Sequence, residues 1–203
     1  QHFRERLAEF SQDPLVCRDI VMLGDSLTEL NDWNKPARSR LVLRNRGISG
    51  DTTDGLLLRL DEVVAVRPRA IFLMIGTNDL WSANSPERIA SNILEITGRI
   101  RAQSPDSMIF VQTIFPVTGA PANWGQAPNN KVRTINARLK AASGKSGYVL
   151  LDTYALAADR NGELKASYPT DGIHLNAAGY RAWSKLVSET LERYSLTASA
   201  PKP

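Results

Sequence analysis

Short apolar segments alternate with longer amphipathic segments along this chain of 203 residues. The short segments are almost continuously apolar, which is typical of strands that are buried on both faces of a parallel sheet. The longer segments repeat apolar residues at helical spacing, so each is expected to bury one face. This alternation predicts strand-helix-strand units around a mostly parallel sheet, and therefore an α/β fold.

Five segments are predicted to be parallel strands of that sheet: residues 20–23, 41–45, 70–75, 108–114 and 148–151. Four helical faces are expected to pack on it, the last from a helix that begins near the N-cap Asn176. These faces consist of Leu56, Leu60 and Val63, of Ile89, Ile93, Ile96 and Ile100, of Val132, Ile135 and Leu139, and of Tyr180, Trp183, Val187 and Leu191. We expect one domain over residues 1–203, with a frayed tail at about 197–203.

Composition and charge exclude several classes of protein. Lys and Arg number 25 against 21 Asp and Glu and are spread along the chain, which gives no case for a nucleic-acid partner. No apolar run approaches the roughly 18 residues of a transmembrane segment. The single Cys17 allows neither an internal disulfide nor a cysteine-rich zinc site. Because the chain begins at Gln1 without a leader, either a signal peptide has been removed or the chain has been trimmed, and an extracytoplasmic location is favoured.

Polar or glycine-rich loops follow four of the predicted strands, at residues 24–27, 47–51, 76–79 and 116–128. In open α/β sheets, ligands bind outside the carboxyl ends of the strands. Since parallel strands end at the same edge, these four loops are expected to lie together. Any functional site is therefore expected there.

Only two histidines are present, and His2 lies at an N-terminus that is expected to be mobile, so His174 is the candidate catalytic imidazole. Asp171 stands three residues earlier, where its carboxylate could accept the imidazole Nδ1–H. On its own this pair is more typical of a surface histidine beside an Asp-Gly turn. Asp152, at the end of the fifth predicted strand, is a rival for the orienting carboxylate.

Ser26 is the candidate nucleophile because it follows an apolar strand through Gly24, at the start of a helix. A serine that only caps the helix is the alternative. Gly50 and Asn78 come at the ends of neighbouring strands, and with the Ser26 N–H they could donate hydrogen bonds to an oxyanion. Each alone is more typical of a turn or cap, but together these residues predict acyl transfer.

Four sequence blocks resemble the ordered blocks of the SGNH hydrolases, the GDSL-like lipase/acylhydrolase family. They are Val-Met-Leu-Gly-Asp-Ser-Leu at 21–27, Asn-Arg-Gly-Ile-Ser-Gly-Asp at 45–51, Ile-Gly-Thr-Asn-Asp at 75–79 and Asp-Gly-Ile-His-Leu at 171–175. The resemblance implies a three-layer α/β/α sandwich with a flavodoxin-like sheet of five parallel strands. It also implies one role for each of five residues: Ser26 as nucleophile and oxyanion donor, Gly50 and Asn78 as the other donors, Asp171 as orienting acid and His174 as base.

Two other families of the same fold class are disfavoured by missing motifs. The segment at 24–28 lacks the second glycine of a Gly-x-Ser-x-Gly elbow, which argues against an α/β-hydrolase. Neither Gly-x-Gly-x-x-Gly nor a P-loop motif is present, which argues against a nucleotide or flavin binder. No cofactor and no metal are expected.

The expected function is a serine esterase that hydrolyses short-chain acyl esters of small molecules or carbohydrates. Similarity to acylhydrolases related to platelet-activating-factor acetylhydrolase subunits implies a small acyl group such as acetyl. Trp33, Trp81 and Trp124 follow three of the strands and could rim the site, although packing within loops is equally expected, and Trp183 is expected in the core. Two alternatives stay open: a lysophospholipase or thioesterase for longer acyl chains, and a non-catalytic carbohydrate-binding module.

Overall fold

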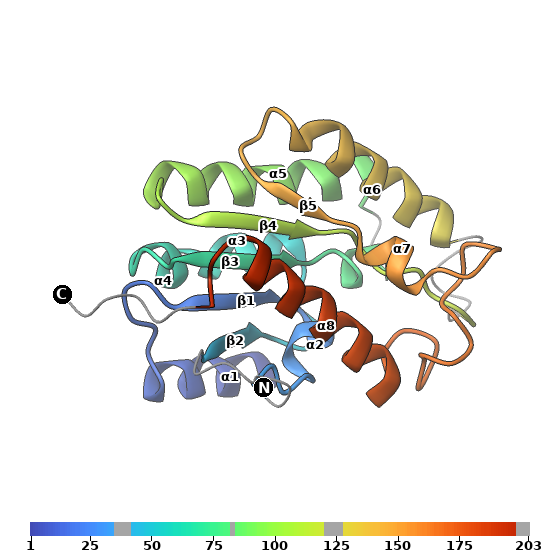
Figure 1. The fold of residues 1–203 in the computed structure, drawn as a ribbon, viewed down its shortest axis with the longest axis horizontal. Coiled ribbons are helices and arrows are strands. Elements are labelled where there is room, and N and C mark those ends of the chain that lie inside the picture. The colour runs from blue at the N-terminus through green and yellow to red at the C-terminus, as the bar shows by residue number, and fades with distance from the viewer. Residues whose placement is uncertain (35–41, 82–83, 120–127, 198–203) are drawn as a thin grey trace.

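A five-stranded parallel sheet forms the centre of the protein in a computed structural model (Figure 1). The structure describes residues 1–34, 42–81, 84–119 and 128–197. The strands are β1 (Ile20–Gly24), β2 (Leu43–Gly47), β3 (Ala70–Met74), β4 (Met108–Gln112) and β5 (Val149–Leu151). They lie in the order β2-β1-β3-β4-β5, the flavodoxin-like order. This confirms the predicted sheet.

The register of the central strands places their carboxyl ends at the same level. Gly24 at the end of β1 pairs with Gly47 of β2 on one side and with Met74 of β3 on the other. In Figure 1 the arrowheads point to the right, so the loops that leave β1, β2 and β3 emerge together at that end. This edge is where the sequence predicts a functional site.

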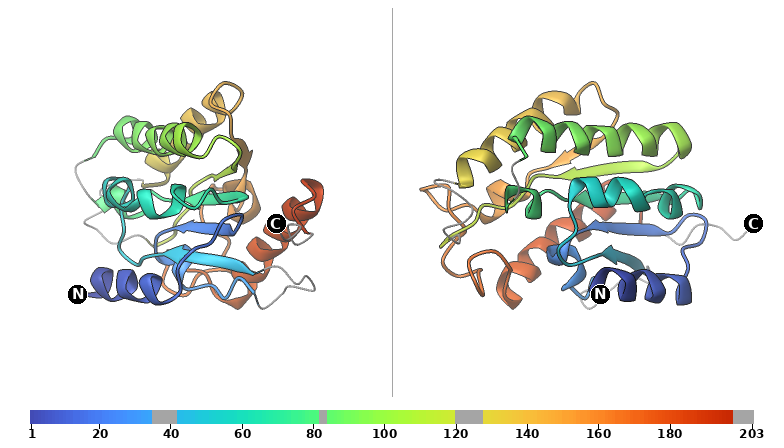
Figure 2. Two further views of the ribbon diagram at one scale, coloured as in Figure 1. Left: turned by 90° about the vertical axis from the view of Figure 1, so that its left-hand side faces the viewer. Right: turned by 180° about the vertical axis from the view of Figure 1, so that it is seen from behind.

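Helices cover both faces of the sheet because alternate strand residues point to opposite sides. Val21 and Leu23 belong to one apolar cluster, and Ile20 and Met22 belong to the other. The first cluster contains residues of α3 (Thr53–Arg59), α4 (Asp61–Val64), α5 (Pro86–Gln103) and α6 (Pro128–Ser143), and the second contains residues of α2 (Ser26–Glu29), α7 (Thr153–Ala157) and α8 (Ala177–Arg193). Figure 2 shows α3 and α5 on the face turned away from α8. The three-layer prediction is confirmed.

Strand boundaries differ from the sequence prediction most at β2. It begins at Leu43 and continues to Gly47, whereas residues 41–45 are predicted, and residue 41 lies outside the described residues. The middle of β2 is polar, at Arg44, Asn45 and Arg46, so an apolar pattern does not mark where the strand ends. An edge strand can be polar in this way because it needs no continuous apolar run. Strands β3 and β4 end slightly earlier than predicted, and the apolar residues that follow them are buried in loops.

Both chain ends can be compared with the sequence prediction. The sequence predicts a mobile N-terminus at His2, whereas in the structure α1 (His2–Gln12) begins there and His2 Nε2 lies 3.0 Å from Glu29 Oε1. The last helix begins as predicted, because the Asn176 side chain accepts the N–H groups of Ala178 and Gly179. Most of the predicted frayed tail, residues 198–203, lies outside the described residues. Among the described helices, none combines the length and apolar character that crossing a membrane requires.

Candidate active site

Ser26 is placed by the sharp exit from β1. Gly24 must lack a side chain, because a Cβ atom there would collide with the carbonyl oxygen of Met74 and with Thr28 Oγ1. Asp25 then caps α2, its Oδ1 accepting the Leu27 N–H at 3.0 Å. Helix α2 therefore begins at Ser26, whose hydroxyl lies at the carboxyl edge of the sheet with the residue 9% exposed.

Three side chains form a continuous hydrogen-bonded chain at this edge. Ser26 Oγ lies 2.9 Å from His174 Nε2, and His174 Nδ1 lies 2.6 Å from Asp171 Oδ2. Both distances are within hydrogen-bond range. The structure thus brings together a hydroxyl, an imidazole and a carboxylate in the order of a Ser-His-Asp triad.

The loop that holds His174 is fixed by the same carboxylate. Asp171 Oδ1 accepts the N–H groups of Ile173 at 3.0 Å and of His174 at 2.8 Å, which leaves Oδ2 for the imidazole. Gly172 has φ +92°, and a Cβ atom there would collide with the carbonyl oxygen of Thr118. Partial burial raises the pKa of Asp171, but the hydrogen bonds from His174 and Ile173 outweigh it and hold the pKa below its ordinary value. Asp171 is therefore an anion near neutral pH.

Asp152, the rival carboxylate, makes its hydrogen bonds with other residues than His174. Its Oδ1 accepts the Ala155 N–H at 2.9 Å and so caps α7, and it lies 3.3 Å from Thr113 Oγ1. The carboxylate that contacts the His174 imidazole is Asp171. Geometry therefore favours Asp171 as the orienting group.

Three hydrogen-bond donors lie at or just after the ends of β1, β2 and β3: the Ser26 N–H, the Gly50 N–H and the Asn78 side-chain amide. Neither the Ser26 N–H nor the Gly50 N–H donates to another group within the described part of the chain. Gly50 has φ +81°, a conformation that favours glycine, and open space lies where a side chain would project. Asn78 Nδ2 donates one hydrogen to the Asp51 carbonyl at 2.8 Å, which fixes the amide and leaves its second hydrogen for a ligand.

Comparison with known protein families finds a match over most of the chain. Residues 22–182 match the family model described as GDSL-like lipase/acylhydrolase. The chain belongs to the GDSL-like lipase/acylhydrolase family. The matched segment runs from β1 into α8, so it includes all five of the residues that the sequence resemblance assigned to the site.

Individual relatives and solved structures are also similar to this member of the GDSL-like family. The chain is 31% identical over 127 residues to the platelet-activating factor acetylhydrolase IB subunit beta homolog of Drosophila melanogaster, and the match covers 60% of this chain and 52% of the relative. The aligned part thus spans about half of that relative's length. A GDSL-like lipase from Bacteroides thetaiotaomicron has a TM-score of 0.81 at 22% identity and covers 94% of this chain and 97% of its own. An acetylxylan esterase from Geobacillus stearothermophilus has a TM-score of 0.68 at 18% identity and covers 86% and 94%. These two structures share the fold.

The structure distinguishes between the two interpretations that the sequence left open for the tryptophans. Trp33 does not rim the site of this GDSL-like protein: it is 3% exposed, its Nε1 donates to the Thr28 carbonyl, and its ring packs edge-on against Trp183 at 4.7 Å between centroids. It is a core residue because α8 lies across it. Trp183 is buried as predicted. Trp81, 48% exposed at the end of the 3-10 helix η1 (Asn78–Trp81), stays a candidate for the rim, and Trp124 lies outside the described residues.

A buried ion pair between Arg59 and Asp51, the residue that follows Gly50, was not predicted from the sequence. Arg59 Nε lies 2.7 Å from Asp51 Oδ2, and the two side chains are 4% and 2% exposed. One signal was available: Arg59 lies at helical spacing from Leu56 and Val63, on the face of α3 and α4 that was predicted to pack on the sheet. A cation within an otherwise apolar face needs a buried partner.

The carboxyl group of Asp25, next to Ser26, has a strongly raised pKa. It is fully buried, and its Oδ2 has no hydrogen-bond partner among the described residues. Burial raises the pKa of Asp25 to about 7, the Leu27 N–H opposes this, and the negative charges of Asp51 and Asp79 add to it. Near neutral pH this carboxyl group is therefore partly protonated.

This shift predicts a pH-dependent loss of stability. The native state holds the Asp25 proton up to about pH 7, whereas the unfolded chain releases it near 3.8, so the free energy of unfolding falls as the pH rises between these values. Asp25 alone is expected to account for a fall of roughly 3 kcal/mol between about pH 5 and pH 8. Asp25→Asn, which mimics the protonated form, should reduce that fall in urea unfolding, whereas Asp61→Asn on the surface should not. Equal pH dependence in wild type and Asp25→Asn would contradict the assignment.

Proposed function

We propose that the protein is a serine esterase that hydrolyses short-chain acyl esters, above all acetyl esters of small molecules or carbohydrates. The observation that supports this most directly is the 2.9 Å contact between Ser26 Oγ and His174 Nε2, backed by the 2.6 Å contact from His174 Nδ1 to Asp171. Together with the oxyanion donors beside it, this chain of contacts provides each group that acyl transfer needs.

In the first half of the reaction, His174 Nε2 removes the Ser26 hydroxyl proton as Oγ attacks the ester carbonyl carbon. The carbonyl oxygen becomes an oxyanion, which receives hydrogen bonds from the Ser26 and Gly50 N–H groups and from the Asn78 amide. When the intermediate collapses, the bond to the alcohol oxygen breaks and His174 protonates the leaving alcohol. An acyl ester on Ser26 remains.

In the second half, water takes the place of the alcohol. His174 removes a proton from the water as the hydroxide oxygen attacks the acyl carbon, and the same donors stabilise the second oxyanion. Collapse breaks the bond to Ser26 Oγ, which recovers its proton from His174, and the carboxylic acid leaves. Asp171 stays ionised throughout and stabilises the imidazolium through Nδ1.

A short acyl group and a carbohydrate alcohol are supported by two comparisons and one side chain. The Drosophila relative is named as a homolog of a platelet-activating factor acetylhydrolase subunit, and the Geobacillus neighbour in fold is named an acetylxylan esterase. Trp81 exposes its ring three residues after Asn78, at the carboxyl edge of the sheet. Exposed aromatic faces at such an edge suit the apolar face of a sugar.

The experiment that tests this proposal is a chain-length profile. Hydrolysis of p-nitrophenyl esters from acetate to decanoate is expected to be fastest for acetate or butyrate and to fall with longer chains, because a site built for a small acyl group would exclude longer ones. Ser26→Ala, checked for folding by circular dichroism, is the control for background hydrolysis. Rates that rise with chain length would instead favour a lysophospholipase or thioesterase, and no activity from folded protein would favour a binding module.

A further inference from the structure

We infer that Arg59 is a positioning residue for the oxyanion-binding groups. It holds the loops that follow β1 and β2 in a fixed position relative to Asn78. This inference rests on the proposed function, because it concerns how the Ser26, Gly50 and Asn78 donors are aligned. It adds to the triad and the donors a buried arginine that touches neither substrate nor nucleophile.

Each nitrogen of the Arg59 guanidinium binds a different segment. Nε donates to Asp51 Oδ2 at 2.7 Å, Nη1 donates to the Arg46 carbonyl at 3.0 Å, and Nη2 donates to the Gly24 carbonyl at 3.0 Å. A planar guanidinium presents its N–H groups in a rigid fork, so the three acceptors are held in one fixed arrangement. The ends of β1 and β2 and the loop after β2 are thereby joined by one side chain.

Two of these three acceptors lie within two residues of an oxyanion donor, and one of those two also holds a donor directly. Gly24 is separated from Ser26 only by Asp25, and its carbonyl also accepts the Ile48 N–H at 3.1 Å. Asp51 directly follows Gly50, and its own carbonyl accepts the Asn78 amide at 2.8 Å. Movement of the guanidinium would therefore displace all three donors at once.

Helix α3 is adapted to this contact. Gly55 lies within the helix, where a Cβ atom would collide with Asp51 Oδ1. Glycine is a poor helix former, so the close approach of the Asp51 carboxylate accounts for its presence. Neighbouring positions of the same face, Leu56 and Leu60, are buried and apolar, so packing on the sheet does not by itself require a cation at 59.

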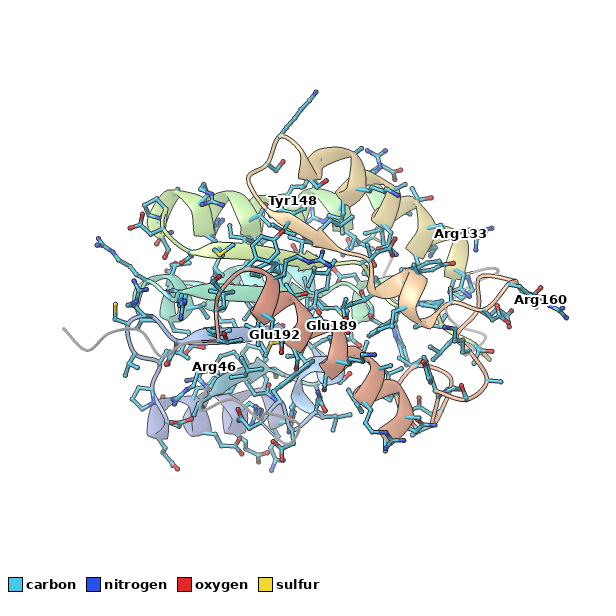
Figure 3. All side chains as sticks on the ribbon, in the orientation of Figure 1. Arg46, Arg133, Tyr148, Arg160, Glu189 and Glu192 are labelled. Atoms are coloured by element: carbon cyan, nitrogen blue, oxygen red, sulfur yellow. The ribbon has the colours of Figure 1, made fainter. Side chains whose placement is uncertain are left out.

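Arg46, the other strongly buried arginine of this region, makes its contacts with a different part of the fold. Its guanidinium lies 4.5 Å from the centroid of the Phe10 ring, and Nη2 donates to the Asp13 carbonyl at the end of α1. Figure 3 labels this side chain beside β2. Its contacts fasten α1 to the sheet, whereas those of Arg59 converge on the donors of the proposed site.

The catalytic rate depends strongly on where the oxyanion donors are placed. Oxyanion donors stabilise the transition state when they lie about 2.7–3.1 Å from the developing charge, and a misplacement of about 1 Å can lower the rate about 100-fold. Lysine at position 59 would keep a positive charge near Asp51, but a single ammonium group cannot reproduce the fork that also binds Arg46 and Gly24. The charge would remain while the alignment was lost.

The test is Arg59→Lys, with Arg101→Lys as the matched control. Arg101 also donates to backbone carbonyls of separate segments, those of Pro105 and Gly147, but it lies at the opposite edge of the sheet. For p-nitrophenyl acetate we expect Arg59→Lys to lower kcat about 10- to 100-fold with KM within about three-fold of wild type. Arg101→Lys should retain the wild-type kcat.

A double-mutant cycle with Asn78→Ala distinguishes positioning from general destabilisation. Asn78→Ala alone is expected to lower kcat about 10²- to 10³-fold. If Arg59 acts through the oxyanion donors, Arg59→Lys should add less in the Asn78→Ala background than in wild type, because the part of its effect that passes through Asn78 is already lost. Independent effects, which multiply, would overturn the inference, and so would an unchanged kcat in folded Arg59→Lys.

Two further comparisons complete the test. If Arg59→Lys does not fold, Asp51→Asn replaces it in the same cycle, because it removes the ion pair while keeping an oxygen acceptor at the same place. Wild-type protein without esterase activity would overturn the proposed function and this inference with it. Active wild type, inactive Ser26→Ala and fully active Arg59→Lys would overturn the positioning role alone.

Discussion

Replacing Ser26 with alanine is expected to lower kcat for p-nitrophenyl acetate by on the order of 10⁶-fold and to leave the fold intact. The loss is large because the Ser26 hydroxyl is the group that His174 activates across 2.9 Å. The fold should persist because Asp25, not Ser26, provides the side chain that caps α2. Single-turnover kinetics measure the rate, and circular dichroism with urea unfolding measures the fold.

Non-additivity provides the sharper form of this prediction. Groups that act as one unit lose almost all of their effect when either is removed, so Ser26→Ala, His174→Ala and the double variant should show nearly equal residual rates. Ser11→Ala is the matched control, since the Ser11 hydroxyl is exposed and donates to the Leu7 carbonyl one turn away in α1. A double variant that is a further hundred-fold slower than either single variant would show that Ser26 and His174 do not act together.

The architecture was predictable from the sequence because the sheet is parallel and buried on both faces. Its central strands form continuous apolar runs such as Ile71-Phe72-Leu73, which are recognised without any knowledge of their neighbours. In a parallel sheet the loops after such strands must leave at one edge. Ser26 and Asn78 could therefore be placed near each other from sequence alone, although their exact geometry could not.

Features that depend on partners distant in the sequence were missed. Trp33 follows β1 in a polar segment, so a place at the rim of the site and packing within a loop were equally expected, but α8 brings Trp183 against it from 150 positions further along the chain. Arg59 was similarly unrecognised, because its role depends on carbonyl oxygens of Gly24 and Arg46 that no sequence pattern reveals. Such contacts are determined by how layers pack, whereas periodicity describes only one element at a time.

Asp171→Asn is expected to lower kcat about 10⁴-fold, and the hydrogen bonds of the loop explain why. Asp171 Oδ1 accepts the N–H groups of Ile173 and His174, so in asparagine the amide oxygen should stay at that position. The amide NH2 then faces His174 Nδ1 in place of the carboxylate oxygen. The imidazole must accept there and carry its own hydrogen on Nε2, where it can no longer take the Ser26 proton.

Asp152→Asn is the matched control for this substitution. Asparagine caps helices about as well as aspartate, so the bond to the Ala155 N–H that begins α7 should persist and kcat should stay within about two-fold of wild type. Both variants are compared with wild type by the kcat for p-nitrophenyl acetate between about pH 6 and pH 9. The substitution changes the tautomer of His174 and not its charge, so raising the pH should not restore the kcat of Asp171→Asn. A large loss in Asp152→Asn with full activity in Asp171→Asn would instead make Asp152 the orienting carboxylate.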